Sequence, residues 1–341
     1  MERESQFIGQ SGAFLDAVER ASRAAPMQRP VLVIGERGTG KELIAERLHR
    51  LSNRWDEPLV TMNCAALPET LIEAELFGHE AGAFTGATKA RAGRFEEADK
   101  GTLFLDELGT LSMGAQERLL RAVEYGEVTR IGSSRPLRVD VRIVAATNED
   151  LPALAAQGKF RADLLDRLSF EVITLPPLRV REGDIGVLAE FFGRRMASEL
   201  RWANWPGFAG HVWDQMEQYP WPGNVRELRN VVERAVYRWD DPESPVGHVV
   251  FDPFESPWKP LGERAASQPE SGDGGAQSVP RAPDLDAVDD LRAAVEAHER
   301  QIVEHALGRN RWNQRQTAKA LGLTYDQLRH CIKKHGLSDG G

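Results

Sequence analysis

The sequence predicts an α/β fold in which a parallel sheet lies between helices, followed by a smaller helical region and a second helical module. Longer segments with helical spacing separate five short apolar runs, and strands that alternate with helices indicate a parallel sheet covered on both faces. After Pro176-Pro177 the strand pattern stops. The runs are Val31–Ile34, Leu59–Met62, Thr102–Leu105, Arg142–Ala146 and Val172–Leu175.

The first run leads directly into a glycine-rich segment. The segment reads Gly35-Glu36-Arg37-Gly38-Thr39-Gly40-Lys41 and is followed by the helical pattern of Leu43, Ile44 and Leu48. A strand, a glycine-rich turn and a helix N-terminus direct several backbone N–H groups into one concavity, where Lys41 adds a full positive charge. This arrangement suits the β- and γ-phosphates, so the sequence predicts a nucleoside triphosphate site.

The next unusual segment is Gly82-Ala83-Phe84-Thr85-Gly86-Ala87, which interrupts a helical region. A glycine costs about 1 kcal/mol inside a helix, so these glycines indicate a loop extruded from the helical region. Residues 71–77 precede the loop and residues 94–98 follow it as helical segments. The alternative is a tight turn with Phe84 packed into the core.

The third run ends in two carboxylates, Asp106 and Glu107. Charges at the end of a buried strand are costly unless they act on a cation or on water. We expect Asp106 to hold Mg²⁺ and Glu107 to polarise the attacking water. Glu42 stands where many such loops place Ser or Thr, so the metal depends mainly on Asp106 and phosphate oxygens. No Asn-Lys-x-Asp signature for guanine is present, which favours ATP over GTP.

Four residues farther along point to a motor-type ATPase. Asn148 follows the fourth strand, where its amide is placed to reach the γ-phosphate or the attacking water. Arg161 and Arg167 lie six residues apart in an apolar-patterned helix, and Arg226 lies just inside a later helix, where it is placed to sense the nucleotide. Taken singly, each is better explained as an ordinary surface salt-bridge residue. Their order along one chain favours the ATPase.

Helices follow from about residue 183 to 250, with Asn224 and Glu227 as an expected capping pair. A stretch rich in Pro, Gly, Ser and Asp then predicts a flexible linker. We expect a nucleotide-binding subdomain at 7–178, a helical lid at 179–252, the linker at 253–286 and a helix-turn-helix domain at 287–341.

The C-terminal segment from Asn313 to His335 has the pattern of a helix-turn-helix. Thr324 is the expected N-cap of its second helix, in which Leu328 and Ile332 share a buried face. Eight Arg or Lys between residues 300 and 336 outweigh two acids, which favours DNA over the alternative of a protein-binding hairpin. The preceding helix, through Val295, Ile302, Val303 and Ala306, is expected to pair with a second copy. The candidate DNA-contacting residues are Arg315, Thr324, Gln327, Arg329, His330 and Lys333.

Composition sets the remaining bounds. A chain of 341 residues with a net charge of −9 predicts two or three domains and argues against nucleic-acid binding over the whole surface. The separate Cys64 and Cys331 form no metal spacing. Reduced thiols, together with the lack of a signal peptide or a long apolar run, predict a cytoplasmic protein.

With these residues in place, the chain resembles the AAA+ bacterial enhancer-binding proteins, the ATPases that activate sigma-54 RNA polymerase. The most specific match is the segment 82–87, which reproduces the family's GAFTGA motif without a substitution. The resemblance covers roughly residues 7–250 and the C-terminal module, which is similar to a Fis-like domain. It implies an AAA+ fold, a hexameric ring, enhancer DNA as a partner and a GAFTGA loop that touches sigma-54.

The resemblance also implies roles for residues already singled out. Lys41, Asp106 and Glu107 match the two Walker motifs, and Asn148 matches sensor I. Arg161 and Arg167 match arginine fingers that enter a neighbouring subunit's site, and Arg226 matches sensor II. Asn63, at the end of the second strand, matches the switch asparagine that pairs with the catalytic glutamate.

Within the family the chain resembles the phage-shock subgroup most closely. Phe7-Ile8-Gly9 opens the ATPase region, so we expect no sensor domain in front of it and control in trans by a PspA-like inhibitor. Trp55, an aromatic residue in a charged loop, is the candidate docking residue. A Trp folded back onto the domain is the alternative. A DNA-translocating helicase or clamp-loader-like protein, and a repressor with a vestigial ATP site, are the rival functions.

Overall fold

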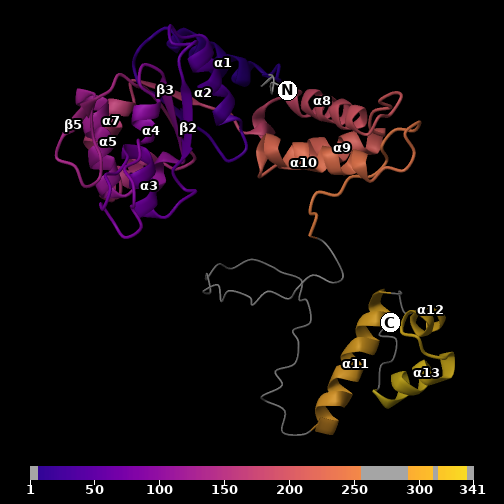
Figure 1. The fold of residues 1–341 in the computed structure, drawn as a ribbon. Helices are drawn as coiled ribbons and strands as arrows, with labels where there is room; N and C mark the ends of the chain where they lie inside the picture. The colour runs from indigo at the N-terminus through magenta and orange to yellow at the C-terminus, as the bar shows by residue number, and fades with distance from the viewer. Residues whose placement is uncertain (1–6, 255–290, 310–313, 336–341) are drawn as a thin grey trace. The chain divides into compact units, whose positions relative to one another are not determined.

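The computed structural model describes residues 7–254, 291–309 and 314–335. The chain divides into two compact units, residues 1–260 and 261–341. The first unit holds the sheet and the lid helices, and the described residues of the second unit form three helices (Figure 1). The expected linker at 253–286 lies almost entirely outside the described residues, and the domain boundaries stay a prediction.

A five-stranded parallel sheet in the order β2-β3-β6-β1-β7 forms the centre of the first unit. All five predicted strands are confirmed. Asn63 lies opposite Asp106 in the register, and Ile34 lies opposite Thr147, so the carboxyl ends of four strands meet at one edge. The strands are β1 (Val31–Ile34), β2 (Leu59–Asn63), β3 (Thr102–Asp106), β6 (Arg142–Thr147) and β7 (Glu171–Thr174).

Helices cover both faces of the sheet, as the alternating strand and helix pattern predicts (Figure 1). On one face, Phe104 and Val144 pack with apolar residues of α1 and α2. On the other, Leu103 and Ile143 pack with residues of α3, α5 and α7. The helices are α1 (Gly12–Ala24), α2 (Lys41–Arg50), α3 (Glu69–Phe77), α4 (Arg94–Glu97), α5 (Met113–Tyr125), α6 (Leu151–Ala156) and α7 (Ala162–Leu168), with the short 3₁₀ helices η1 (Leu108–Thr110) and η2 (Leu178–Val180).

One element escaped the sequence analysis. A small antiparallel hairpin, β4 (Glu127–Thr129) with β5 (Pro136–Arg138), follows α5. All three residues of its second strand are exposed, so the strand carries no alternating apolar pattern that would predict it.

The lid contains the three helices α8, α9 and α10, and the sequence predicts helices from about residue 183 to 250. Its core surrounds the fully buried Trp221 and includes Leu228 and Val232 of the last helix. The helices are α8 (Asp184–Glu199), α9 (Gly210–Gln218) and α10 (Asn224–Tyr237). In the described part of the chain, no helix combines the length and the apolar character needed to cross a bilayer.

The second unit consists of α11 (Leu291–Arg309), α12 (Gln314–Ala320) and α13 (Tyr325–Lys334). Its small core contains Val303, Leu307, Ala318 and Leu328. The expectation that Val303 and Ala306 pair with a second copy is wrong. Both are buried within the unit, because its two short helices need a third helix to cover their apolar faces, whereas Ile302 is exposed. Val295 lies outside the residues whose side chains are described.

Candidate active site

The glycine-rich segment forms a tight loop between β1 and α2. Gly38 and Gly40 have φ values of 79° and 97°, in the left-handed region that favours glycine. A Cβ on Gly38 would lie 2.3 Å from the carbonyl oxygen of Gly223, at the start of the lid helix α10. The loop therefore needs glycine both for its own turn and for the close approach of the lid.

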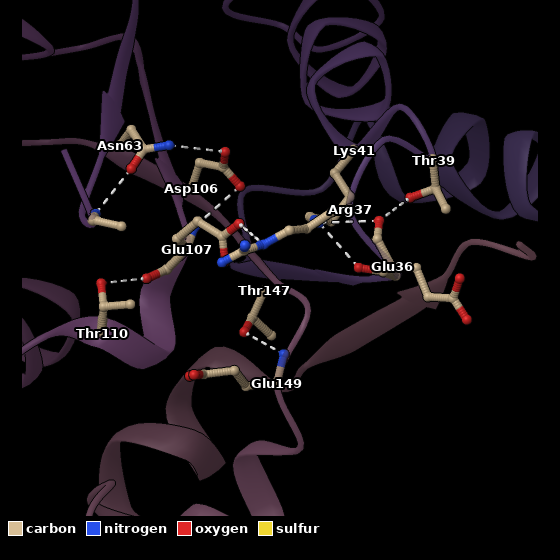
Figure 2. A network of polar contacts seen from close by, with 12 residues as sticks. Glu36, Arg37, Thr39, Lys41, Asn63, Asp106, Glu107, Thr110, Thr147 and Glu149 are labelled. Carbon is tan, nitrogen blue, oxygen red and sulfur yellow. Dashed lines mark hydrogen bonds and ion pairs between the residues drawn. The ribbon is translucent and has the colours of Figure 1, made fainter. Parts of the chain in front are cut away.

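Lys41 opens α2 and is buried, with 8% of its surface exposed. Its Nζ donates to the carbonyl oxygens of Gly35 at 3.0 Å and Glu36 at 3.4 Å (Figure 2). Burial lowers the pKa of Lys41, and the negative charges of Asp106 and Glu107 oppose that shift. The ammonium group thus lies in the loop, held by carbonyl groups that phosphate oxygens can replace.

Asp106 and Glu107 stand at the end of β3 beside the loop (Figure 2). The Asp106 carboxylate accepts the backbone N–H of Glu107 at 3.0 Å, and its other oxygen lies 3.4 Å from the Asn63 amide nitrogen. Asn63 therefore faces Asp106, and the part of the chain that the structure describes shows no hydrogen bond between Asn63 and Glu107. The reason lies in the register, because Asn63 is directly opposite Asp106.

Glu107 has an unusual backbone and its own charged partner. Its φ of 55° lies in the left-handed region, which costs a non-glycine residue energy and is typical of functional positions. Its Oε1 lies 3.6 Å from the Nε of Arg37, which belongs to the glycine-rich loop. The loop and the third strand are thus joined by an ion pair that the spacing of motifs does not predict.

The carboxylate of Asp106 suits Mg²⁺. One of its oxygens has only a long contact to the Asn63 amide, which leaves lone pairs for a cation. Among the described residues there is no cluster of three or more His, Cys, Asp or Glu side chains that could hold a metal ion, so Asp106 would act as a single carboxylate ligand. That donor set fits Mg²⁺, which commonly uses one or two carboxylates together with phosphates and water.

The predicted sensor and finger residues lie near the ends of elements. Asn148 follows β6 and is exposed. Arg161 immediately precedes α7 rather than lying within it, and pairs with Asp163 at 2.7 Å. Arg167 pairs with Glu124 of α5 at 2.6 Å. Within the described residues, neither arginine pairs with a carboxylate of the phosphate-binding site.

The lid meets the loop through Asn224 and Arg226. The backbone N–H of Arg226 donates to the Gly38 carbonyl at 3.3 Å, and the Arg226 side chain is exposed. The expected capping role of Asn224 is wrong. Its side chain instead accepts from the Leu178 N–H at 2.7 Å and donates to Glu36 and to the Arg37 carbonyl, while Glu227 accepts the Gly223 N–H.

A second contact between lid and loop joins Arg179 to Glu36 at 2.6 Å. The hydrogen bonds from Arg179 and Asn224 lower the pKa of Glu36 to about 2. The sequence predicts Glu36 in the nucleotide site but does not predict Asn224 and Arg179 as its partners. A positive φ of 52° at Asn224 marks it as special in the structure, but nothing in the sequence shows that angle.

The GAFTGA segment forms an extruded loop between α3 and α4, as predicted. Inside it, the Gly82 N–H donates to the Ala87 carbonyl and the Ala87 N–H donates to the Phe84 carbonyl. Phe84 keeps 38% of its surface exposed and packs edge-on against His79 at 5.0 Å between ring centroids. The alternative of a Phe84 buried in the core is therefore wrong.

Trp55 is the exposed tip of a second loop, with 66% of its surface accessible. Its neighbour Arg54 anchors the loop by an ion pair to Asp140 at 2.6 Å and by hydrogen bonds to the carbonyls of Lys100 and Gly101. The alternative of a Trp folded back onto the domain is wrong. The tryptophan stands on a rigidly held loop and faces solvent.

In the second unit, α12 and α13 form a helix-turn-helix. Thr324 is confirmed as the N-cap of α13, and Gln327 completes a capping box with it. Gln327 is therefore held by the helix terminus, whereas Arg329, His330 and Lys333 are exposed. The side chain of Arg315 lies outside the described residues.

Three family models match the chain in order. The model described as "Sigma-54 interaction domain" matches residues 7–174, and the model "AAA+ ATPase lid domain" matches residues 179–249. The model "Bacterial regulatory protein, Fis family" matches residues 294–335. The Psp operon transcriptional activator of Escherichia coli (strain K12) is 50% identical over 334 residues, which are 98% of this chain and 99% of that protein. The chain belongs to the sigma-54-dependent AAA+ activators.

Other members of this sigma-54-dependent family are longer than the chain. The nitric oxide reductase transcription regulator NorR2 of Cupriavidus necator is 43% identical over 331 residues, and the match spans 63% of its length. The structure of NtrX from Brucella abortus in complex with ATP has a TM-score of 0.67 and 30% identity over 97% of this chain and 70% of NtrX. The sigma-54-dependent activator described here is thus an AAA+ ATPase of the Psp activator (PspF) type, with a nucleotide-binding domain, a lid and a DNA-binding helix-turn-helix.

Proposed function

We propose that the chain binds enhancer DNA, assembles into a hexameric ring and uses ATP hydrolysis to convert the sigma-54 RNA polymerase closed complex into an open complex. The observation that carries this proposal is the GAFTGA loop. It stands out between α3 and α4 with Phe84 and Thr85 accessible, flanked by Gly82 and Gly86 in left-handed conformations. An exposed hydrophobic tip of this kind is suited to a contact with another protein.

Within the ATP site, each charged side chain has one task. Lys41 binds the terminal phosphates, whose oxygens would replace the carbonyl groups of Gly35 and Glu36 as acceptors for its ammonium group. Asp106 would hold Mg²⁺, which neutralises phosphate charge during phosphoryl transfer. Glu107 orients the attacking water, with Asn148 near the γ-phosphate and Arg226 reporting nucleotide from the lid. The residues with these roles lie at or near the carboxyl ends of the strands, which the parallel sheet brings to one edge, or on the lid.

The ring follows from the two finger arginines. Arg161 and Arg167 pair with carboxylates away from their own site, so they are available to complete a neighbouring subunit's site. Their partners lie on exposed surface, where such pairs contribute little and are readily exchanged. Analytical ultracentrifugation with ATP should show a hexamer, and a monomer at every protein concentration would contradict this proposal.

Binding of enhancer DNA is assigned to α13. Arg329, His330 and Lys333 present an exposed, partly cationic face, as expected for a helix laid in the major groove. Lys334 instead pairs with Glu299 at 2.8 Å and braces α11. A dimer of this domain, paired through surface other than Val303 and Ala306, would match two half-sites.

Control in trans by a PspA-like inhibitor is assigned to Trp55. The anchored loop presents this side chain to solvent, and an aromatic anchor on a rigid loop is suited to a protein interface. We expect Trp55→Ala to keep ATPase activity and to lose inhibition by purified PspA. Tyr237→Ala is the control, because Tyr237 is an equally exposed aromatic residue on the lid. Full inhibition of the Trp55→Ala variant would refute the assignment.

The experiment that tests the proposed output replaces Thr85, at the tip of the GAFTGA loop. Thr85→Ala should leave ATP hydrolysis and DNA binding within about twofold of the unchanged protein and abolish open-complex formation, because it removes a contact outside the ATP site. Thr88→Ala, just beyond the motif, is the matched control and should remain active. Normal promoter opening by Thr85→Ala would show that the loop does not act on sigma-54 productively.

A further inference from the structure

The side chain of Glu107 is the movable part of an otherwise fixed residue. Its N–H donates to the Asp106 carboxylate at 3.0 Å, and its carbonyl accepts from the Thr110 hydroxyl at 2.8 Å (Figure 2). The backbone is therefore held on both sides in its left-handed conformation. Because the backbone is held, the position of the Glu107 carboxylate depends on the charged side chain with which it pairs.

In this structure the attracting group is Arg37. The two side chains lie 3.6 Å apart, with 13% of the Glu107 side chain and 72% of the Arg37 side chain exposed. The backbone of Arg37 is fixed, because its carbonyl accepts from the Asn224 amide at 3.1 Å. Asn63, the residue expected to restrain Glu107, faces Asp106 instead. The ion pair with Arg37 is thus the restraint on the Glu107 carboxylate within the described residues.

Arg37 also lies where a triphosphate would bind. It belongs to the loop whose N–H groups surround the phosphate site, and its charge is among those that act on Lys41. A long, single contact to an exposed arginine is weak, because solvent screens the attraction between the two charges. A bound triphosphate carries several negative charges and offers Arg37 a stronger, bidentate partner. The two anions therefore compete for one guanidinium group.

We propose that Arg37 alternates between two anions: it holds Glu107 in the nucleotide-free protein and transfers to the terminal phosphate when ATP binds, which frees Glu107 to orient the attacking water. This inference rests on the roles proposed above for the loop and for Glu107. It couples the arrival of the γ-phosphate to the release of the general base. ADP, which lacks that phosphate, leaves the Arg37–Glu107 pair in place.

The test is a double-mutant cycle on nucleotide affinity in the full chain. Equilibrium binding of a non-hydrolysable ATP analogue and of ADP is measured with Mg²⁺ for the unchanged protein, Arg37→Gln, Glu107→Gln and the double variant. Arg37→Gln should weaken analogue binding by about tenfold and ADP binding by less than about threefold. Glu107→Gln should tighten analogue binding when Arg37 is present. The factor should be at least about threefold larger than the factor by which the same substitution changes binding in the Arg37→Gln variant.

Two further variants complete the design. Arg37→Lys keeps the positive charge and should restore most of the preference for the analogue over ADP. Arg194→Gln, at an exposed lid arginine paired with Glu190, is the control and should combine additively with Glu107→Gln. Because Arg37 is largely exposed, its variants are expected to fold, which unchanged circular dichroism checks.

Equal weakening of analogue and ADP by Arg37→Gln would overturn the proposal, because Arg37 would then not reach the terminal phosphate. Additive effects of Arg37→Gln and Glu107→Gln would overturn it as well, since the two side chains would not exchange. Failure of the proposed function gives a different result. Normal nucleotide binding by Lys41→Ala, or unchanged hydrolysis by Glu107→Gln, would remove the assigned roles whatever the cycle shows.

Discussion

At the scale of single residues, Lys41 and Arg142 are buried cations whose hydrogen-bond partners are backbone carbonyl groups, whereas the buried Arg181 pairs with Asp184. Lys41 uses the carbonyls of its own loop, where phosphate can later replace them. Arg142 at the start of β6 is buried to 2% exposure, and its guanidinium group donates to the carbonyls of Ala24, Ala25 and Leu48. Arg142 thereby caps the C-terminal ends of α1 and α2, where the unpaired carbonyl groups carry partial negative charge.

Arg142→Met should therefore destabilise the nucleotide domain by about 3 kcal/mol, because three buried carbonyl groups lose their donor. Burial lowers the pKa of Arg142 to about 10, so the residue remains charged at neutral pH and its removal is felt there. Urea unfolding, followed by circular dichroism, measures the loss. Arg138→Met, at an exposed arginine nearby in sequence, should change stability by less than about 0.5 kcal/mol. Equal midpoints for the two variants would contradict this account.

Sequence alone could locate Lys41, Asp106 and Glu107, because each follows a buried strand in a pattern that the chemistry requires. It could not predict the partner of Glu107. The Arg37–Glu107 pair depends on how far the glycine-rich loop reaches across the sheet edge, and the facing of Asn63 toward Asp106 depends on the strand register. Both contacts depend on the tertiary structure, and no local sequence pattern predicts them.

At the scale of elements, the lid and the phosphate-binding loop are joined through Asn224. This fully buried residue connects the first turn of α10 to Leu178, Glu36 and the carbonyl of Arg37. The Glu36 carboxylate, with its pKa lowered to about 2, contributes its stabilisation above the ordinary value of 4.5. That contribution is lost as pH falls from 4.5 through 2, so the junction is intact at neutral pH.

Asn224→Ala should weaken ATP binding by about tenfold while leaving the sheet domain folded, because the lid loses its hydrogen bonds to the loop and gains strain at a positive φ. Fluorescence titration with a labelled nucleotide measures the affinity. Asn230→Ala, at an exposed asparagine on the same helix, serves as the control. Unchanged affinity in Asn224→Ala would mean that the lid contact does not support the nucleotide site.

The elements themselves were largely predictable, for physical reasons that also explain the failures. The five strands of the sheet and the lid helices have clear apolar patterns, and the two glycines of the GAFTGA segment correctly indicated a loop. The hairpin of β4 and β5 was missed because its strands are three residues long and mostly solvent-facing. The prediction that Asn224 caps the helix was wrong because a polar side chain next to a helix start can form hydrogen bonds with several neighbouring groups. Asn224 bonds to Leu178, Glu36 and Arg37 instead of to the helix terminus.

At the scale of the whole molecule, the chain combines an ATPase, an exposed contact loop and a DNA-binding helix pair. In the proposed function these parts act in sequence. The DNA-binding unit concentrates the protein near a promoter, ATP hydrolysis in the ring moves the GAFTGA loops, and the loops remodel the polymerase. In this sequence promoter opening depends on ATP hydrolysis. Hydrolysis without promoter opening would therefore show that the ATPase activity is not coupled to remodelling of the polymerase.

Open-complex formation at a sigma-54 promoter tests this coupling most directly. Purified protein, sigma-54 RNA polymerase and promoter DNA with its enhancer are combined with ATP or with a non-hydrolysable analogue, and DNA melting is followed by permanganate reactivity. The account predicts melting with ATP and none with the analogue. Melting with the analogue, or steady ATP hydrolysis without any melting, would contradict it.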